Sequence, residues 1–529
     1  MANEPTTPID APRERGLSGQ DATSLIARLG TTAWVAAALP ILAAITAGGW
    51  LLLYRWYGLF ENRNNTHFSF EKIPGWFDSP TMRLTAVIFL LLSAAYIVSV
   101  VLLQATQLTT GVKLSIVALV VSAAIANIAL YPVGALDVFN YMIELKLAFH
   151  YGENPYLVTF EAFRDDPYAL PAFLVDITLF YGPAWLLVMW VPTAVVGFHD
   201  VIDTLLALKI FNLIMLAATA VLIGWRQRGE RAGWIAATLF LANPLVLFEG
   251  VGNAHNDVLL TLFIVAAMIA LERHSPLAGP LLALSALVKL YTVALAPIFL
   301  VVVLKERWGW RRTAVSALLT IVTVVAVCAP YWGDGKLVDG LRSGLEESQE
   351  MDHVSPLSLA RQYAQEQEAR DHVFPDMVRS RPSFEIVPED TRNDIRTGFT
   401  IAFVIGALAI ATSVWRGRDP VRAAADTLLL LFVLMTNLYP WYLIPVIALL
   451  ALRPDRLGRG YIAVATTLGL VYYPMFIYGH FNSGWTRFQI HLFLALFLTV
   501  PIVIYLLARA RTWLTPPRAP RHDLGTEMP

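Results

Sequence analysis

The chain has 529 residues, of which 57% are hydrophobic and 15% are charged. An average soluble domain has about 25% charged residues, so the charge is too sparse for a soluble protein, and the apolar content excludes a disordered one. The single cysteine, Cys328, excludes a disulfide framework, and the net charge of −1 gives no support for nucleic-acid binding. Because only helices satisfy their own backbone in lipid, we predict an all-α polytopic membrane protein.

The chain divides into three regions by composition. A polar arm over 1–31 precedes a transmembrane domain over 32–511, and a Pro/Arg-rich tail over 512–529 follows it. The arm is too long and too acidic to be the first part of a cleavable signal peptide. We predict that both end segments are flexible and cytoplasmic.

Apolar runs of the length that spans a bilayer follow one another along the transmembrane domain. A span needs about 20 mostly apolar residues. The runs that reach or approach this length, with a shorter one near 182–197, are 32–54, 83–105, 112–133, 201–224, 232–250, 257–272, 313–330, 398–415, 460–480 and 488–509. Two more, 276–304 and 424–451, are too long for one upright helix and contain helix breakers. We expect roughly 11–15 transmembrane or half-membrane helices.

The positively charged residues of the short loops predict the orientation of the bundle, because such residues favour the cytoplasmic side. They form clusters at 226–231, 305–312, 416–418, 453–459 and 509–511. With these clusters inside, the loops 250–256, 331–397 and 481–487 lie outside. The segments 276–304 and 424–451 must then return to the side from which they enter. We predict half-helices that meet near Lys289–Tyr291 and Leu438–Trp441.

The segment 182–197 conflicts with this orientation if it crosses the membrane. Two full crossings between residues 182 and 224 would place the cluster at 226–231 outside. The segment is short, begins with Tyr-Gly-Pro and contains Pro192. We therefore predict that it does not cross fully.

The first outer segment, 134–181, contains a candidate amphipathic helix that begins at Asp137. Its apolar stripe favours a position flat on the membrane interface. On one face the helix would present four polar side chains, Asp137, Asn140, Tyr141 and Glu144. Two interpretations remain open: an ordinary surface helix with solvated acids, or two carboxylates held at the bilayer edge for chemistry.

The segment 249–257 collects Asn253, His255, Asn256 and Asp257 between two apolar helices. Asn256 or Asp257 could cap the following helix, which would explain one residue but not four. Polar groups near membrane depth are costly and commonly functional. The cluster is therefore a candidate site.

Lys289 lies midway along an apolar segment, where a lysine costs about 2.5–3.5 kcal/mol on insertion. It requires a phosphate partner, a buried acid such as Asp426, or a path to the surface. Lys209 raises the same question. The aromatic residues near the second turn form either an interfacial belt or a wall that stacks on sugar, and they are Tyr439, Trp441 and Tyr442.

The long outer loop, 331–397, exceeds an ordinary connection, and we predict that it folds as a lid over the outer face. Its acids lack the close spacing of metal ligands. The chain shows no phosphate-binding Gly loop and no zinc motif. We therefore assign no metal site, and metal dependence stays open.

Several short motifs occur in a characteristic order over residues 137–442, and with them the chain resembles the GT-C superfamily of integral-membrane glycosyltransferases. It is most similar to the bacterial mannosyltransferases that use polyprenyl-phosphate-mannose. The motifs are Asp137-Val-Phe-Asn-Tyr141, Asn154-Pro-Tyr156, Tyr181-Gly-Pro-Ala-Trp185, Asn243-Pro244, Gly252-Asn-Ala-His-Asn-Asp257, Leu287-Val-Lys289 and Tyr439-Pro-Trp-Tyr442.

The resemblance implies a catalytic cavity on the outer face of a bacterial cytoplasmic membrane and an inverting transfer from a lipid-phosphate donor. Asp137 takes the place of the family's catalytic acid, as the general base. The family often has two adjacent acids, whereas Asp137 has none beside it, so Glu144 or Asp165 is the candidate second acid. A cation should stabilise the leaving phosphate. Lys289 is the first candidate for that cation, with His255 and Lys209 as further phosphate-binding residues.

The remaining polar and aromatic candidates are assigned to sugar or acceptor binding: Asn140, Tyr141, Tyr181, Trp185, Asn253, Asn256, Asp257, Tyr439, Trp441 and Tyr442. The partners implied are a membrane lipid donor and a glycan, glycolipid or protein acceptor. Half-helices and a mid-membrane lysine also occur in transporters and lipid flippases, which stay the alternative. Transporters usually have paired halves, and no convincing internal repeat is visible here.

Overall fold

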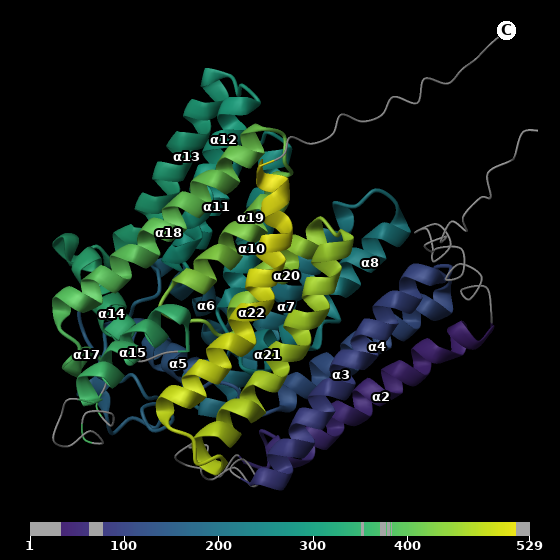
Figure 1. Cartoon of the computed structure of the whole chain (residues 1–529), viewed down its shortest axis with the longest axis horizontal. Helices are drawn as coiled ribbons and strands as arrows, with labels where there is room; N and C mark the ends of the chain where they lie inside the picture. The colour runs from purple at the N-terminus through teal and green to yellow at the C-terminus, as the bar shows by residue number, and fades with distance from the viewer. Residues whose placement is uncertain are drawn as a thin grey trace, which may run out of the picture.

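The computed structural model describes residues 33–62, 78–350, 354–370, 377, 381 and 383–514. The predicted arm, 1–31, and all but the first residues of the predicted tail, 512–529, lie outside this part of the chain. The described residues form helices and no strand, and one isolated bridge joins Gly58 to Leu130. The protein is therefore an all-α polytopic membrane protein, as predicted (Figure 1).

Three long helices form one side of the molecule, where they lie side by side in Figure 1: α2 (Ala33–Tyr57), α3 (Ser79–Ala105) and α4 (Thr110–Ala129). Side-chain caps determine where two of them begin. Asp78 accepts a hydrogen bond from the backbone N–H of Thr81 at 3.1 Å, and Thr109 accepts one from Val112 at 3.3 Å. Such caps satisfy N–H groups that a helix leaves without partners.

The central part of the chain alternates short and long helices. A 52° bend separates α8 from the turns that follow it. In chain order the elements are α5 (Asp137–Phe149), η2 (Phe160–Phe163), α6 (Pro183–Val196), α7 (Val201–Trp225), α8 (Glu230–Leu241), α9 (Pro244–Leu247), η3 (Phe248–Gly252) and α10 (Asp257–Glu272).

Both long apolar segments are interrupted as predicted. The first consists of α11 (Ala278–Ala286), η4 (Leu290–Leu295) and α12 (Ala296–Lys305), and the second of α19 (Pro420–Leu434), η7 (Pro440–Tyr442) and α20 (Leu443–Leu452). An ion pair between His274 and Glu306 joins the two ends of the first segment. Asp419 and Arg453, 3.3 Å apart, join the ends of the second. Each segment therefore returns to the end of the bundle from which it started.

The rest of the chain supplies long spans and the outer loop: α13 (Trp310–Cys328), η5 (Ala329–Tyr331), η6 (Gly333–Gly335), α14 (Lys336–Glu350), α15 (Pro356–Arg370), α17 (Ser383–Ile386), α18 (Glu389–Trp415), α21 (Arg456–Asn482) and α22 (Arg487–Leu514). The described part of the long loop folds into helices. It contacts the break in the second interrupted segment, because Leu438 donates a backbone hydrogen bond to Val354 at 3.2 Å.

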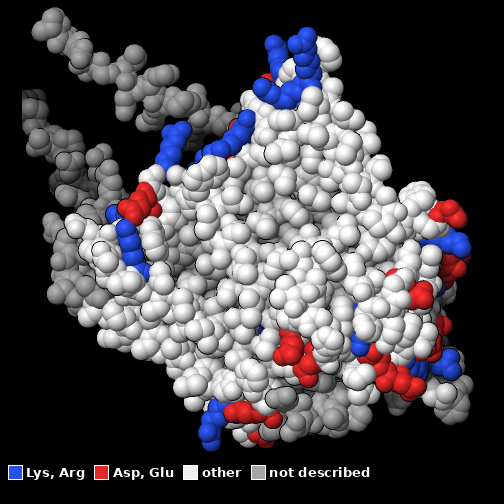
Figure 2. Space-filling view, turned by 180° about the vertical axis from the view of Figure 1, so that it is seen from behind, with Lys and Arg blue, Asp and Glu red and all other residues white. Residues whose placement is uncertain are grey.

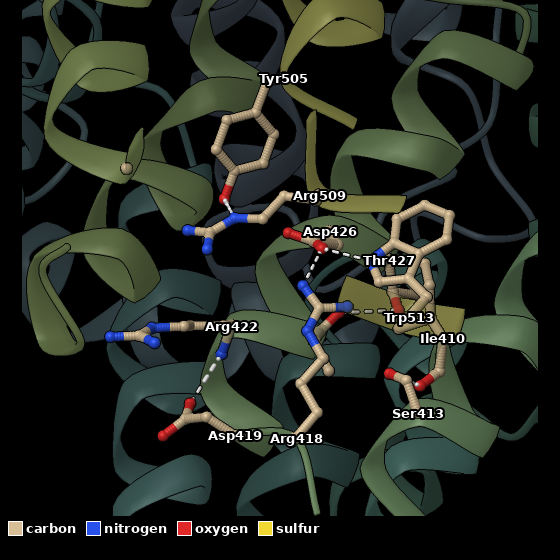
Figure 3. Close-up of polar contacts among 12 residues, drawn as sticks. Ile410, Ser413, Arg418, Asp419, Arg422, Asp426, Thr427, Tyr505, Arg509 and Trp513 are labelled. Atoms are coloured by element: carbon tan, nitrogen blue, oxygen red, sulfur yellow. Dashed lines mark hydrogen bonds and ion pairs between the residues drawn. The ribbon is translucent and has the colours of Figure 1, made fainter. Parts of the chain in front are cut away.

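Basic residues collect at one end of the bundle, which we call the cationic end and define by Arg226, Lys305, Arg418, Arg453 and Arg509. Acids there bind them: Glu272 contacts Arg226 and Arg453, and Asp455 contacts Arg509. Figure 3 shows Arg418 and the indole of Trp513 converging on Asp426. In Figure 2 basic side chains cap the upper edge, and a broad uncharged belt separates them from acids lower down.

The short helix α6 does not reverse the side of the chain, as predicted. At its start Gly182 donates a hydrogen bond to Val288, in the break of the first interrupted segment. After its end, Asp200 accepts one from Tyr168 of the preceding outer segment, at 2.8 Å. Because α6 stays on that side, α7 alone carries the chain to the cationic end, and the conflict around residues 182–231 disappears.

Eight helices among the described residues are long and apolar enough to cross a membrane, or nine if the bent α8–η3 pair counts as one span. Three shorter apolar helices accompany them, at Pro183–Val196, Leu290–Lys305 and Pro440–Leu452. The predicted combination of full spans and half-membrane helices is therefore present.

Candidate active site

The centre of the candidate site is the buried ion pair between Lys289 and Asp257. Lys289 occupies the extended break between α11 and η4, and its Nζ lies 2.6 Å from Asp257 Oδ2. Tyr291 donates a hydrogen bond to the other carboxylate oxygen at 3.0 Å. The ammonium also lies 5.3 Å from the ring centre of Tyr181 and 5.2 Å from that of Tyr442. The lysine therefore has a buried acid as its partner, and this acid is Asp257 rather than Asp426.

Asp137 is the first residue of α5 and is partly buried beside this ion pair. Burial raises the pKa of Asp137 to about 6, although the positive charge of Lys289 opposes the increase and the negative charge of Asp257 adds to it. A carboxyl group with a pKa near neutrality can exchange protons readily under physiological conditions. Its position and its pKa both suit proton transfer.

Glu144 lies two turns further along α5. Burial, together with the negative charge of Asp137, raises the pKa of Glu144 well above its usual value. Its Oε2 atom has no hydrogen-bond partner among the described residues. Burial therefore favours the neutral form of Glu144, which can donate a hydrogen bond.

The helix α5 begins at Asp137 as predicted, and its flat position on the membrane interface stays a prediction. Polar residues of the helix are buried together with the apolar stripe, because the outer segment folds over them. Asn140 accepts hydrogen bonds from the backbone of Phe173 at 3.0 Å and Leu174 at 3.1 Å. Lys146 forms a buried ion pair with Asp166 at 2.6 Å. Asn140 thus holds the outer segment in this structure.

Aromatic side chains surround the ion pair on two sides. Tyr141 packs against Tyr181 and Trp185, with ring centres 5.3 and 5.1 Å apart. On the other side Trp441 stacks between His255, at 4.2 Å, and Tyr439, at 4.4 Å. These rings lie inside the protein, so they do not form the interfacial belt that was one interpretation of the sequence.

The segment before Asp137 is attached directly to the polar cluster. Asn253 accepts a hydrogen bond from the backbone N–H of Gly134 at 3.0 Å and donates one to Glu249 at 2.9 Å. A Cβ atom at Gly134 would lie 2.2 Å from the Asn253 amide nitrogen, so only glycine permits this contact. Tyr473 donates a second hydrogen bond to Glu249. Asn253 therefore positions the start of α5.

Two neighbouring side chains of the cluster are fully buried but lack hydrogen-bond partners among the described residues. Asn256 occupies the N-cap position of α10, yet its side chain makes no capping bond, and neither its oxygen nor its nitrogen is bonded. Both ring nitrogens of His255 are also unbonded, with Nε2 3.5 Å from Glu249. An unsatisfied buried polar group costs about 1–3 kcal/mol. These groups are therefore available to a ligand.

Lys209 lies in a different environment from Lys289. It is fully buried, and its ammonium donates hydrogen bonds to the carbonyl oxygens of Asn127, at 3.2 Å, and Leu130. These carbonyls belong to the C-terminal end of α4, where a cation is favourable. The structure therefore assigns Lys209 an anchoring contact.

The Tyr181-Gly-Pro-Ala-Trp185 motif packs closely against the break that carries Lys289. Gly182 donates a hydrogen bond to Val288 at 3.0 Å, and Ala184 donates one to Leu287 at 3.0 Å. A Cβ atom at Gly182 would lie 2.0 Å from the Leu287 carbonyl oxygen. The Tyr156 hydroxyl donates to the Tyr181 carbonyl at 2.8 Å. The motif thus places the Tyr181 ring against the lysine.

Sequence reasoning did not select Tyr291, Glu249 or Tyr473 as site residues. A local signal existed for two of them. Tyr291 follows Lys289 by two residues across an extended break, and Glu249 precedes Asn253 by four, the spacing of side-chain contacts on a helix. Tyr473 comes from α21, far along the chain, and had no such signal. Within the described ranges, no three His, Cys, Asp or Glu residues form a group suited to a metal ion.

The fold and this site define a multi-pass membrane protein with a buried cluster of acids, a lysine and aromatic rings at the end opposite the cationic end. Residues 43–305 match the N-terminal domain of the alpha-(1->6)-mannopyranosyltransferase family, and residues 179–437 match glycosyltransferase family 87. The region common to both matches contains Tyr181, Asp257 and Lys289.

One characterised relative is similar over part of the chain. Alpha-(1->6)-mannopyranosyltransferase A of Mycobacterium tuberculosis is 30% identical over 230 residues, which is 39% of this chain and 42% of that protein. The chain thus matches about two fifths of the relative's length. These similarities confirm the predicted resemblance to membrane mannosyltransferases of the GT-C type.

Proposed function

We propose that the protein is a membrane mannosyltransferase that transfers mannose, with inversion, from a polyprenyl-phosphate donor to a hydroxyl group at the outer face of a bacterial cytoplasmic membrane. The observation that carries the proposal is the position of Asp137 beside the Lys289–Asp257 pair, within a wall of aromatic rings. The similarity to one mannosyltransferase family and one glycosyltransferase family supports the sugar-transfer chemistry.

Asp137 is the proposed general base. As the acceptor hydroxyl attacks the anomeric carbon, the carboxylate takes the hydroxyl proton, and the bond from that carbon to the phosphate oxygen breaks. The partial burial and raised pKa of Asp137 support this assignment. Glu144, whose neutral form is favoured by burial, is the proposed hydrogen-bond donor that supports Asp137.

Lys289 is the proposed phosphate-binding residue. The leaving phosphate gains negative charge during transfer, and an ammonium held in place stabilises that charge. Asp257 and Tyr291 position Lys289, and their contacts support this assignment. The unbonded atoms of His255 and Asn256 are suited to phosphate or sugar oxygens, and the stacked Tyr439 and Trp441 rings to the sugar ring.

The transmembrane domain, 32–511, therefore carries the proposed catalytic unit. Its outer segments are 134–181, which contributes Asp137, and 331–397, of which the described part contacts the second break. The acceptor in this proposal is a hydroxyl group of a glycan, glycolipid or protein. The lipid donor agrees with a site enclosed by membrane helices.

The experiment is a transfer assay in proteoliposomes with radiolabelled polyprenyl-phosphate-mannose. The Asp137→Asn variant should lose at least about a hundredfold in turnover, the lower part of the range for a general base. The Lys289→Ala variant should lose turnover at every donor concentration. Asp165, the other candidate second acid, is exposed to solvent and is therefore not part of the buried site. Asp165→Asn is the matched control and should keep wild-type activity.

Near-normal turnover by correctly folded Asp137→Asn protein would contradict its role as base. Uptake of the labelled lipid across the bilayer without any mannosylated product would instead favour the transporter or flippase alternative. Thermal unfolding of each purified variant separates a loss of chemistry from a loss of folding.

A further inference from the structure

A groove far from the candidate active site opens between α4, α7 and α8. Its volume is about 700 Å³, within the range of about 300–1,000 Å³ that is typical of ligand pockets. Most of its wall is apolar and built from small side chains. The lining residues include Val117, Val121, Ala217, Ala220, Gly233 and Ala237.

The groove exists because two of its helices approach each other very closely. A Cβ atom at Gly233 would lie 2.8 Å from the Gly224 carbonyl oxygen, and one at Gly224 would lie 3.2 Å from that of Gly233. The Gly224 and Gly233 backbones thus bring α7 against α8. Because the alanine side chains beside them are short, they leave space that α4 does not fill.

The length of the groove along the helix axis corresponds to the thickness of one leaflet of a bilayer. Along α8 its wall extends from Glu230 to Leu241. At 1.5 Å per residue this stretch is about 16 Å long, about half of a hydrocarbon core that is about 30 Å thick. The polar lining residues Gln227 and Glu230 lie near the cationic end of the bundle.

The rim at that end carries more positive than negative charge. Lys113 forms an ion pair with Glu230, which joins α4 to α8 beside the groove. Arg228 and Arg231 are exposed nearby, and Arg231 donates a hydrogen bond to the Gln104 carbonyl. Three cations thus face one carboxylate. Basic residues where helices meet the membrane surface attract anionic lipid headgroups.

We propose that this groove binds one anionic phospholipid from the leaflet at the cationic end, with an acyl chain between α4 and the α7–α8 pair and the headgroup at Arg228 and Arg231. The length of the groove, about the thickness of one leaflet, fits an acyl chain. Because this groove lies at the opposite end from Asp137, its lipid is not the sugar donor, and the proposal is independent of sugar transfer.

The bound lipid would support the helix that leads to the active site. At its other end α4 is anchored by Lys209 and continues to Gly134 and Asp137. A chain that fills the space beside α4 therefore stabilises the position from which the outer segment begins.

The test is a titration of delipidated protein in detergent with phosphatidylglycerol, followed by native mass spectrometry. One molecule of phosphatidylglycerol should remain bound, and phosphatidylethanolamine should bind several-fold more weakly. Ala217→Phe fills the groove and should weaken phosphatidylglycerol binding about tenfold. Ala317→Phe, on the exposed surface of α13, is the matched control and should bind as wild type does.

A second variant keeps the test decisive if the filled groove does not fold. Arg228→Gln changes an exposed residue and should remove most of the preference for phosphatidylglycerol over phosphatidylethanolamine. Equal binding by the Ala217→Phe and Ala317→Phe proteins would overturn the proposal. Tighter binding of a polyprenyl phosphate than of phosphatidylglycerol would overturn it as well, because the occupant would then be a different lipid.

Discussion

Two opposing effects act on the carboxyl group of Asp137 at the start of α5. The N-terminus of α5 favours a negative charge, yet burial raises the pKa of the carboxyl to about 6. The positive charge of the nearby Lys289 limits this increase in the pKa of Asp137. The group is thus an effective base only above about pH 6, and its charge reduces the stability of the folded protein.

The pH dependence of transfer should therefore follow the ionisation of Asp137. Because the base must be deprotonated, turnover should increase as pH rises through about 6 and reach a plateau above pH 7. At pH 5 it should be about tenfold lower than the plateau. A pH profile of the initial rate measures this. A rate that stays constant from pH 5 to pH 8 would contradict the assigned pKa.

The same shift predicts that the Asp137→Asn variant is more stable than the wild type at neutral pH. Since the folded pKa exceeds the unfolded value, the folded state binds the proton more tightly. The stability from this group is present below about pH 4 and is lost as pH rises through about 6. The variant should gain at most ~3 kcal/mol at pH 7.5 and nothing near pH 4. Thermal unfolding at both pH values tests this expectation.

At the scale of elements, the two interrupted segments form the site. Each break leaves a short extended stretch between helix ends, and these stretches carry Lys289 and Tyr439. The helix α6 closes against the first break through backbone hydrogen bonds, and the long outer loop closes against the second. The site therefore forms where the breaks of the two interrupted segments come together, and side chains at these breaks can face an enclosed space.

The contact between α6 and the first break should be sensitive to one methyl group. In Gly182→Ala the new Cβ atom would approach the Leu287 carbonyl oxygen to 2.0 Å, so one of the two segments must move. Overpacking of this kind costs about 1–3 kcal/mol. We expect a lower unfolding temperature and a marked loss of transfer, because Tyr181 and Lys289 would separate.

Gly460→Ala is the matched control, because nothing lies within 4 Å of the Cβ position at Gly460. It should behave as wild type in both measurements. If Gly182→Ala also retains wild-type stability and activity, the close contact between α6 and the break is not needed for the site.

At the scale of the whole molecule, charge divides the bundle into two ends. Arginines of several loops meet acids at the cationic end, and Figure 2 shows basic side chains along that edge. Asp137 and its outer segment lie at the other end, beyond the C-terminal end of α4. The positive-inside rule places the cationic end in the cytoplasm. On this basis we predict that the candidate active site faces outward.

Cysteine labelling in intact cells tests this orientation, because the chain has only Cys328 to remove. In a Cys328→Ser background, Asp165→Cys should react with a membrane-impermeant maleimide. Arg228→Cys should react only after permeabilisation. Both positions are exposed in the structure. The reverse labelling pattern would place the site on the cytoplasmic side and contradict the proposed transfer at the outer face.

Local patterns in the sequence were sufficient for the elements that depend on neighbouring residues. The start of α5 at Asp137, the break at Lys289 and the incomplete crossing of α6 were all predicted, because helix periodicity, apolar length and loop charge are properties of short stretches. The partners of polar side chains were not predictable in this way. Lys289 binds Asp257 rather than Asp426, and Asn140 and Lys209 bind backbone groups from distant segments.

The sequence by itself determined that this is a polytopic membrane protein with two returning segments and one strongly basic end. Those features follow from the free-energy cost of exposing charge or unpaired backbone groups to lipid. This cost applies to each segment independently of the rest of the fold. Only the tertiary structure decided which polar groups are already bonded and which, such as Asn256 and His255, remain available inside the site. That distinction depends on which helices meet, because a buried polar group is satisfied by whatever segment packs against it.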